Sequence, residues 1–223
     1  LISFPFNSEQ PIDDVLPIYT KNMLQAIIGQ NESLLIHESG IYGSLTEFKP
    51  GRGYWLIAND YSIFQFSDPV EANSSITLDE TLDNEIFDYN QSTLQSTYFT
   101  ETIYISGEIN NEEMQLNVFC NDMLVGGRKW TNSFTDIIAM GNDGYEWTDN
   151  YCEFGQNISI KDSSDKELFI VEGSNEWLAN NFNIVTLSNS NFGDLNFNQV
   201  INITDVVIMI EHIINTTPFN NDH

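Results

Sequence analysis

The sequence predicts a mainly β protein made of a small N-terminal β module, an antiparallel β-sandwich and a C-terminal loop followed by a helix. Short apolar runs alternate with turn residues from about residue 86 to residue 188, the spacing typical of an antiparallel sandwich. Shorter runs precede them, and an apolar segment with helical period lies near the end of the chain. We therefore expect the module over 1–66, a linker over 67–85, the sandwich over 86–189 and the loop with its helix over 190–223.

The N-terminal module begins with a strand-like pattern. Ile2, Phe4 and Phe6 recur with the period of a strand, and Pro5 suits a strand that pairs on one side only. An extended apolar segment of this kind can add to the exposed sheet edge of a neighbouring subunit. Pairing within its own module is the alternative. Because the chain opens with Leu1 and shows no charged leader, we also expect it to be a mature or internal part of a longer precursor.

Helices and further strands follow in this module. Asp13 and Asp14 favour a helix start within 11–16, and a second short helix is expected over 19–28, ending at Gly29. Strands are then expected at 33–37, 41–44, 54–58 and 62–66.

Three stretches of the module occur together: Leu1-Ile2-Ser3-Phe4-Pro5, Gly43-Ser44-Leu45 and Pro50-Gly51-Arg52-Gly53-Tyr54-Trp55. This combination resembles a small β module of secreted, cell-surface proteins over about residues 1–66. The resemblance implies an extracellular protein and supplies no catalytic residues. Tyr54 and Trp55 are either core residues or a pair that stacks on a sugar, and core packing is the more frequent role of large aromatic side chains.

The sandwich is predicted from strand-like runs separated by turn signals such as Asn121-Asp122, Gly126-Gly127 and Asn142-Asp143-Gly144. The runs are 103–105, 114–120, 123–125, 157–161, 168–171 and 183–187. Cys120 and Cys152 lie in this strand-rich region, where they form either a disulfide, as in many secreted proteins, or two buried thiols.

The charge of the chain excludes one class of partner. Seven basic residues against 33 acidic ones give a net charge of −26. Nucleic acid is excluded because phosphate neutralisation needs clustered Lys and Arg, and an anionic membrane surface is disfavoured for the same reason. No apolar run approaches the roughly 20 residues of a membrane span. Such acidity suits a saline or calcium-rich medium.

The C-terminal loop carries oxygen-bearing side chains at the spacing of a calcium loop. In a twelve-residue loop that starts at Asp194, such side chains occupy the first, third, fifth, ninth and twelfth positions, and the seventh residue offers its carbonyl. Thr204 or Asp205 can cap the apolar helix that follows. An Asn-rich turn without metal is the alternative. The predicted Ca²⁺ ligands are Asp194, Asn196, Asn198, Val200, Asn202 and Asp205.

This segment, residues 193–214, resembles one repeat of a dockerin, the calcium-loop-and-helix module of extracellular bacterial assemblies. Asp205 at the twelfth position matches that pattern. Gln199 departs from it, since the sixth position of a calcium loop favours Gly. Dockerins have two such repeats, and this chain has one. The resemblance implies weak calcium binding of the extracellular kind, at about 10⁻⁴ to 10⁻³ M. The helix is apolar nearly all round, so we expect another surface to cover it.

Two further patterns bear on location and activity. Sequons for N-glycosylation are compatible with an extracellular glycoprotein, although several arise by chance in a chain so rich in Asn, Ser and Thr. His37, His212 and His223 are scattered, and no nucleophile–histidine motif or phosphate loop is present. We therefore expect a protein that is not an enzyme. The sequons begin at Asn31, Asn73, Asn90, Asn157, Asn202 and Asn215.

Two classes of function remain. The first is a structural or adhesive extracellular protein, a subunit of a calcium-stabilised surface assembly or filament that joins copies of itself head to tail or joins another extracellular protein. The second is a carbohydrate-binding module of an extracellular glycan-degrading system, with Trp130, Trp147 and Trp177 as stacking platforms. The strand at 1–6 and the apolar helix favour the first.

Overall fold

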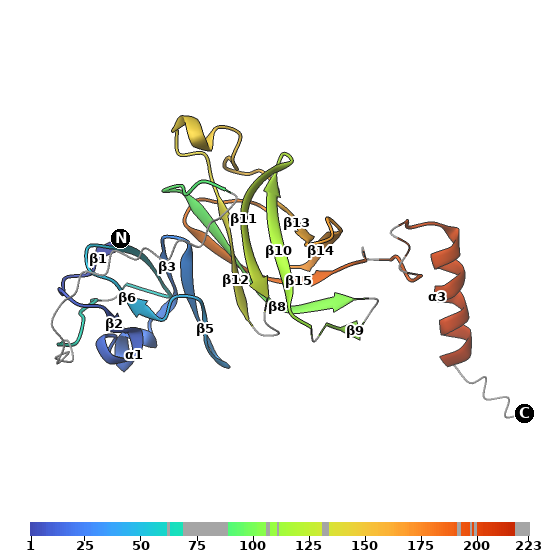
Figure 1. Ribbon diagram of the computed structural model, residues 1–223. Coiled ribbons are helices and arrows are strands. Elements are labelled where there is room, and N and C mark those ends of the chain that lie inside the picture. The colour runs from blue at the N-terminus through green and yellow to red at the C-terminus, as the bar shows by residue number, and fades with distance from the viewer. Residues whose placement is uncertain are drawn as a thin grey trace, which may run out of the picture.

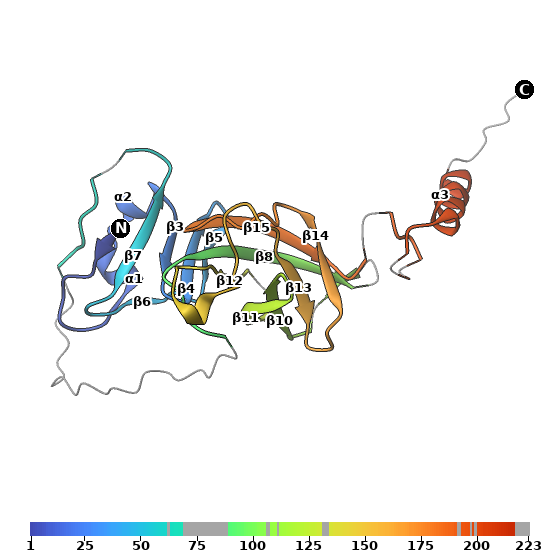
Figure 2. The same ribbon diagram turned by 90° about the horizontal axis from the view of Figure 1, so that it is seen from above.

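The protein is mainly β, as the sequence predicts. The computed structural model describes residues 1–61, 63–68, 89–105, 108–110, 112–130, 134–190, 193–196, 198 and 200–216. Within these residues fifteen strands and three α-helices occur. The molecule is elongated: the N-terminal module lies at one end, a larger curled sheet lies in the middle, and the C-terminal helix lies at the other end (Figures 1 and 2).

The N-terminal module is an antiparallel five-stranded sheet with two short helices against it. Its strand order is β1-β7-β3-β4-β5, and a separate pair, β2 with β6, lies beside it. Phe4, Leu45 and Phe48 are buried in its core together with Phe66 at its edge. The elements are β1 Ile2–Ser3, β2 Gln10–Pro11, α1 Ile12–Val15, α2 Ile18–Lys21, β3 Leu24–Gly29, β4 Glu32–His37, β5 Gly40–Gly43, β6 Glu47–Phe48 and β7 Gly53–Ala58.

The predicted helix over 19–28 is wrong beyond Lys21. Residues 24–29 form β3, a central strand between β7 and β4. Ala26, Ile27 and Ile28 are all buried, because both faces of this strand are covered. A short continuous apolar run has no period that separates a buried strand from a helix. The strand predicted over 62–66 is also absent from the described residues 63–66, and Ser62 lies outside them.

The apolar segment at residues 1–6 pairs within its own module. In β1, Ile2 lies opposite Tyr54 and Ser3 opposite Gly53 of β7. The Phe4 amide donates to the Arg52 carbonyl at 3.1 Å, and the Phe4 ring is buried. The expectation that this segment adds to the sheet of a neighbouring subunit is therefore wrong.

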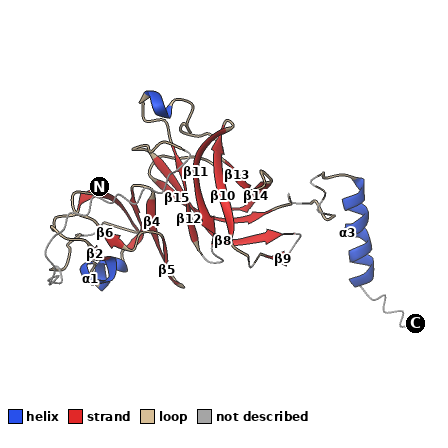
Figure 3. Ribbon diagram, viewed as in Figure 1, coloured by secondary structure: helices blue, strands red, loops and turns tan. Residues whose placement is uncertain are grey.

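The second sheet has eight strands in the order β11-β10-β13-β14-β15-β8-β12, with β9 paired to β8. All its pairs are antiparallel except β15 with β8, which is parallel. The sheet curls until its end strands β11 and β12 meet, so it resembles a nearly closed barrel (Figures 1 and 3). The strands are β8 Gln95–Ile105, β9 Glu108–Ile109, β10 Met114–Cys120, β11 Met123–Trp130, β12 Thr135–Met140, β13 Ser159–Asp162, β14 Glu167–Glu172 and β15 Asn181–Ser188.

Gly126 is what allows the two end strands to approach. A Cβ at this position of β11 would lie 1.6 Å from the Ile138 carbonyl oxygen of β12. Only a residue without a side chain fits so close to another backbone. The curled sheet encloses one continuous core that includes Trp130, Trp177 and Tyr98.

The strand-like runs predicted for this region each overlap an observed strand. The sequence predicted neither the two-residue strand β9 nor the longer strand β12. All six of its residues are buried, so it lacks the alternation of a half-exposed strand, and it includes an acidic residue, Asp136. The predicted linker over 67–85 lies outside the described residues except for 67 and 68.

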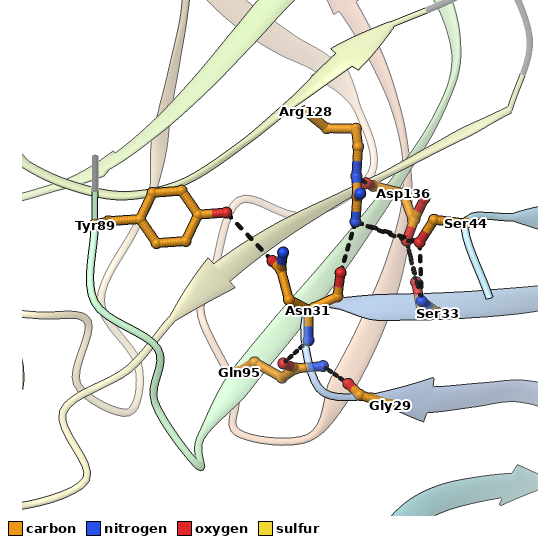
Figure 4. A network of polar contacts seen from close by, with 8 residues as sticks. All are labelled: Gly29, Asn31, Ser33, Ser44, Tyr89, Gln95, Arg128 and Asp136. Atoms are coloured by element: carbon orange, nitrogen blue, oxygen red, sulfur yellow. Dashed lines mark hydrogen bonds and ion pairs between the residues drawn. The ribbon is translucent and has the colours of Figure 1, made fainter. Parts of the chain in front are cut away.

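A polar network joins the N-terminal module to the curled sheet (Figure 4). The buried carboxylate of Asp136 accepts hydrogen bonds from the Ser33 amide at 3.1 Å, from the Ser33 hydroxyl at 2.9 Å and from the Ser44 hydroxyl. Arg128 Nη2 lies 3.5 Å from the same carboxylate and donates to the Asn31 carbonyl at 2.8 Å.

Gln95 extends this contact on the other side of Asn31 (Figure 4). Its Nε2 donates to the Gly29 carbonyl at 2.6 Å, and its Oε1 accepts from the Asn31 amide at 3.2 Å. The β3–β4 turn is thus bonded on two sides to the curled sheet. Buried polar groups that are satisfied in this way fix one relative arrangement of the packed parts.

The C-terminal helix α3 spans Ile203–Thr216 and projects away from the rest of the molecule (Figure 1). Of the described helices, none has the length and apolar character needed to cross a membrane.

Candidate metal-binding loop and exposed helix

The loop before α3 is folded around two aspartates. Asp194 and Asp205 are both buried, at 2% and 1% exposure. Asp205 Oδ1 accepts from the amides of Leu195 at 2.9 Å and Asn196 at 3.3 Å, and Asp194 Oδ1 accepts from the Asn198 amide at 3.1 Å. The first and last residues of the predicted calcium loop are therefore both turned toward its interior.

Asp205 also caps α3. Its Oδ2 accepts from the Asn202 amide at 2.8 Å, and the Asn202 Oδ1 accepts from the Thr204 amide at 2.8 Å. This reciprocal pair is a capping box with Asn202 at the N-cap and Asp205 three residues later. The cap predicted at Thr204 or Asp205 is thus found at Asn202, two residues before Thr204, with Asp205 as its second member. The hydrogen bond from the Asn202 amide, followed by those from Asn196 and Leu195, lowers the pKa of Asp205.

The loop's asparagines hold their oxygens in local turns. Asn196 Oδ1 accepts from the Asn198 amide at 3.1 Å, and Asn198 Oδ1 accepts from the Val200 amide at 2.8 Å. The Val200 carbonyl accepts from Asn202 Nδ2 at 3.1 Å. An Asn side chain that accepts a hydrogen bond from the backbone amide two residues later forms an Asx turn.

These oxygens fit a hard cation. A carbonyl or carboxylate oxygen has two lone pairs, so one that accepts an amide hydrogen bond retains a lone pair for a metal ion. All six predicted ligands offer oxygen, the donor that Ca²⁺ requires. Two buried carboxylates in one loop bring negative charges together, and a bound cation would neutralise them. Asp194, Asn196, Asn198, Val200, Asn202 and Asp205 are the residues that would hold it.

The small number of carboxylates in the loop limits its expected affinity for calcium. Across the residues that the structure describes, no group of three or more His, Cys, Asp and Glu side chains comes together. The loop itself contributes two carboxylates, where strong calcium sites contribute three or more. A site of this composition is expected to bind calcium in the millimolar range, as extracellular modules do.

The helix that this loop holds is apolar and exposed. Exposure is 45% for Val206, 49% for Ile210 and 56% for Ile214, and the exposed apolar side chains together occupy one broad face of the helix. Large exposed apolar surfaces mark interaction sites on proteins. The exposed apolar residues of α3 are Ile203, Val206, Val207, Met209, Ile210, Ile213 and Ile214.

A second set of exposed apolar side chains lies in the N-terminal module. Ile18 is 77% exposed in α2, and Tyr61 and Ile63 are 95% and 78% exposed in the segment after β7. The two segments are adjacent, since the Asn59 amide donates to the Met23 carbonyl at 2.9 Å. α2 and α3 lie at opposite ends of the molecule (Figure 2).

The three tryptophans proposed as sugar platforms differ in position. Trp130 and Trp177 are buried in the core, so they are not platforms. The Trp177 indole donates to the Ala139 carbonyl at 2.9 Å. Trp147 is 54% exposed on a projecting loop, and Tyr145, which the sequence did not single out, stacks on it with ring centroids 4.7 Å apart. In the N-terminal module Tyr54 is a core residue, and Trp55 is 40% exposed.

Cys120 and Cys152 form a disulfide in the structure, with Cα atoms 5.4 Å apart. Both are fully buried. This bond joins β10 to the loop that carries Trp147.

The sequons occupy different environments. Asn157 and Asn90 are exposed, and Asn90 donates through Nδ2 to the Trp147 carbonyl. Asn31 and Asn202 are part of hydrogen-bonded turns, so a glycan there would replace existing contacts. Asn73 and the side chain of Asn215 lie outside the described residues.

No protein-family model matches the chain, and neither a curated protein nor a solved structure is detectably similar to it.

Proposed function

We propose that this protein is a non-catalytic extracellular structural protein, a subunit that assembles head to tail through α3 in the presence of calcium. One observation carries the proposal: a helix with a broad face of exposed apolar side chains follows a loop that buries two carboxylates. Exposing these apolar side chains to water is unfavourable in free energy. Contact with a second apolar surface would remove them from water.

The partner surface is the exposed apolar part of the N-terminal module on another copy. Ile18, Tyr61 and Ile63 form the head surface, and the apolar side chains of α3 form the tail surface. α2, which contributes Ile18 to the head surface, and α3 lie at opposite ends of the molecule (Figure 2). A contact between unlike surfaces is heterologous, so it continues from copy to copy and forms a filament unless the rotation closes a ring.

Calcium has two effects in this proposal. Bound in the loop, it would neutralise Asp194 and Asp205 and hold the first turn of α3 against the loop. In solution, calcium and other cations screen the repulsion between copies that each have a net charge of −26. The proposed extracellular location is supported by the disulfide and agrees with the calcium concentration that a weak site would need.

Sedimentation velocity in millimolar calcium tests the proposal on two double variants of the full chain. The tail variant is Ile210→Ser with Ile214→Ser, and the head variant is Tyr61→Ser with Ile63→Ser. Wild type is expected to form large assemblies, whereas each variant alone remains monomeric. A mixture of the two variants is expected to form dimers and nothing larger, since one intact head meets one intact tail.

The control is Ile109→Ser, an exposed apolar residue of β9 that belongs to neither surface, and it should assemble as wild type does. Dimers of the head variant alone would show that α3 pairs with α3 instead. A wild type that stays monomeric at high concentration would refute the proposal.

A further inference from the structure

The loop between β12 and β13 is fixed at its base. Gly141 and Cys152 form a β-bridge there, and the Asn142 amide donates to the Cys152 carbonyl at 2.9 Å. The disulfide to Cys120 holds the same point against β10. A side chain on Gly141 would meet the Trp177 ring at 2.2 Å, so the base is packed directly on the core.

Asp143 fixes the inside of the loop. Its Oδ1 accepts from the Thr148 hydroxyl at 2.7 Å, and its Oδ2 accepts from the Thr93 amide at 2.9 Å and hydroxyl at 3.1 Å. Partial burial would raise the pKa of Asp143, but the hydrogen bonds from Thr93, Thr148 and Tyr145 outweigh it and lower the pKa to about 2. The carboxylate is therefore charged and bonded at every physiological pH.

This rigid loop exposes two large aromatic side chains. Trp147, in the short helical turn η1 Glu146–Thr148, is 54% exposed, and Tyr145 beside it is 52% exposed. Their rings are stacked, with planes 5° apart. The loop projects from the end of the curled sheet (Figures 1 and 3). Rigidly held, exposed Trp and Tyr side chains are characteristic of binding surfaces, because little conformational entropy is lost when a ligand contacts them.

A groove of about 450 Å³ runs beside Trp147. Its walls combine apolar surface with two polar side chains, Asn90 and Asp149. Asn90 is held in place by two hydrogen bonds. Its side-chain Nδ2 donates to the Trp147 carbonyl at 3.1 Å, and its backbone amide donates to the Tyr151 hydroxyl at 2.7 Å. The lining residues are Tyr89, Asn90, Met123, Leu124, Trp147, Asp149 and Tyr151.

The chemistry of the groove selects a neutral ligand with many hydroxyl groups. The Asp149 carboxylate and the Asn90 Oδ1 are acceptors, and within the described part of the chain the structure gives neither a partner. Acceptors complement hydroxyl donors. Among the described residues that line the groove there is no Lys or Arg, so they offer an anionic ligand no counter-charge. A cationic ligand is usually held by several rings set around it, whereas Tyr145 stacks on one face of Trp147 and leaves a ligand only the opposite face of the indole.

We propose that the groove beside Trp147 binds a neutral oligosaccharide or polysaccharide, with one sugar ring stacked on the Trp147 indole and its hydroxyls donating to Asp149 and Asn90. The C–H face of a sugar ring is flat and apolar and matches an exposed indole face, while its hydroxyl edge matches the two acceptors. This site is separate from the α3 surface, so a subunit in an assembly would present it repeatedly, and weak single contacts would add up to strong attachment.

The test is titration calorimetry of the full chain, produced without N-glycosylation so that Asn90 carries no sugar. The probes are cello-, xylo-, chito- and manno-oligosaccharides, with pull-down on the corresponding insoluble polymers. At least one probe is expected to bind with a Kd below about 1 mM, and Trp147→Ala is expected to weaken that binding by about tenfold or more. Asp149→Asn is expected to weaken the same binding, because an amide replaces one acceptor oxygen with a donor.

Phe154→Ala is the matched control, because Phe154 is 79% exposed and does not line this groove. It should leave sugar binding unchanged, as should the α3 double variant, which separates failure of this site from failure of assembly. The proposal is overturned if no probe binds or if Trp147→Ala binds as wild type does. Trp147-dependent binding of a lysine-rich peptide, without sugar binding, would instead identify a cation site.

Discussion

Removing the carboxylate of Asp136 should loosen the joint between the N-terminal module and the curled sheet. In Asp136→Ala the amide and hydroxyl of Ser33, which is fully buried, lose their acceptor, and the partly buried Arg128 loses its counter-charge. Each unsatisfied buried donor costs about 1–3 kcal/mol, and breaking a buried ion pair costs about 3–5 kcal/mol. These costs overlap, so we expect a total loss of about 3–5 kcal/mol in the free energy of unfolding.

Urea unfolding followed by tryptophan fluorescence measures this loss. Asp136→Asn keeps an acceptor for the serine donors and should lose less, about 1–2 kcal/mol. Glu167→Ala, at an exposed position of β14, should stay within about 0.5 kcal/mol of wild type. If Asp136→Ala also stays within that range, the polar network does not hold the modules together.

The pH dependence gives an independent check with a definite sign. Burial raises the pKa of Asp136, although Arg128, Ser44 and Ser33 oppose the shift. A carboxyl with a raised folded pKa contributes its full stability below its unfolded pKa of about 3.9, and that contribution falls as the pH rises through the folded value. The deficit of Asp136→Asn relative to wild type should therefore shrink as the pH rises from about 4. A deficit that grows over this range would contradict the dominance of burial.

Three further predictions concern the curled sheet. The Cys120–Cys152 disulfide spans 32 residues of sequence, so the double alanine variant should lose about 3–4 kcal/mol in the chain-entropy model; titration of the denatured, unreduced protein should find no free thiol, and two thiols would disprove the bond. Gly126→Ala would force a methyl group to within 1.6 Å of the Ile138 carbonyl oxygen and should cost about 3 kcal/mol or more. Gly53→Ala is its control, because its nearest neighbour lies at an ordinary 3.6 Å, and equal melting temperatures for the two variants would refute the close approach. Asp143→Asn should lose about 1 kcal/mol at neutral pH after allowance for solvent screening; because the pKa of Asp143 is lowered to about 2, the difference should vanish as the pH falls through that value, and a difference that persists in strong acid would contradict it.

The sequence predicts the parts of this fold that depend on local pattern. Runs in which apolar and polar residues alternate, such as 114–120, form strands because one face of each strand contacts the core. β3 and β12 are buried on both faces, so they show no alternation. The first was predicted as a helix and the second was not predicted. The hydrogen bond that joins Asn31 to Arg128, 97 residues later, has no sequence signature at all.

The two candidate sites also differ in how far local sequence reveals them. The twelve-residue loop could be read from the sequence because its Asx turns and capping box connect residues two to four positions apart. The Trp147 groove could not, because tryptophan in a sequence gives no indication of exposure: Trp130 and Trp177 pack in the core, and Trp147 lies outside it. The turn signal Asn142-Asp143-Gly144 marked the loop, but the contact of Asp143 with Thr93 that makes it rigid is nonlocal.

Sedimentation equilibrium tests directly whether calcium binding in the loop drives assembly. Wild type and Asp194→Ala are compared as free calcium is raised from zero to about 10 mM, with calcium binding measured in parallel by calorimetry. The average mass of wild type is expected to rise well above that of one 25.4 kDa chain. The calcium concentration at the midpoint of this rise should equal the concentration at which calorimetry finds the loop half-saturated. Asp194→Ala should bind no calcium in the loop and should assemble far less. Calcium binding without any increase in mass would contradict the role of the loop in assembly, and so would assembly of Asp194→Ala at the same calcium concentration as wild type.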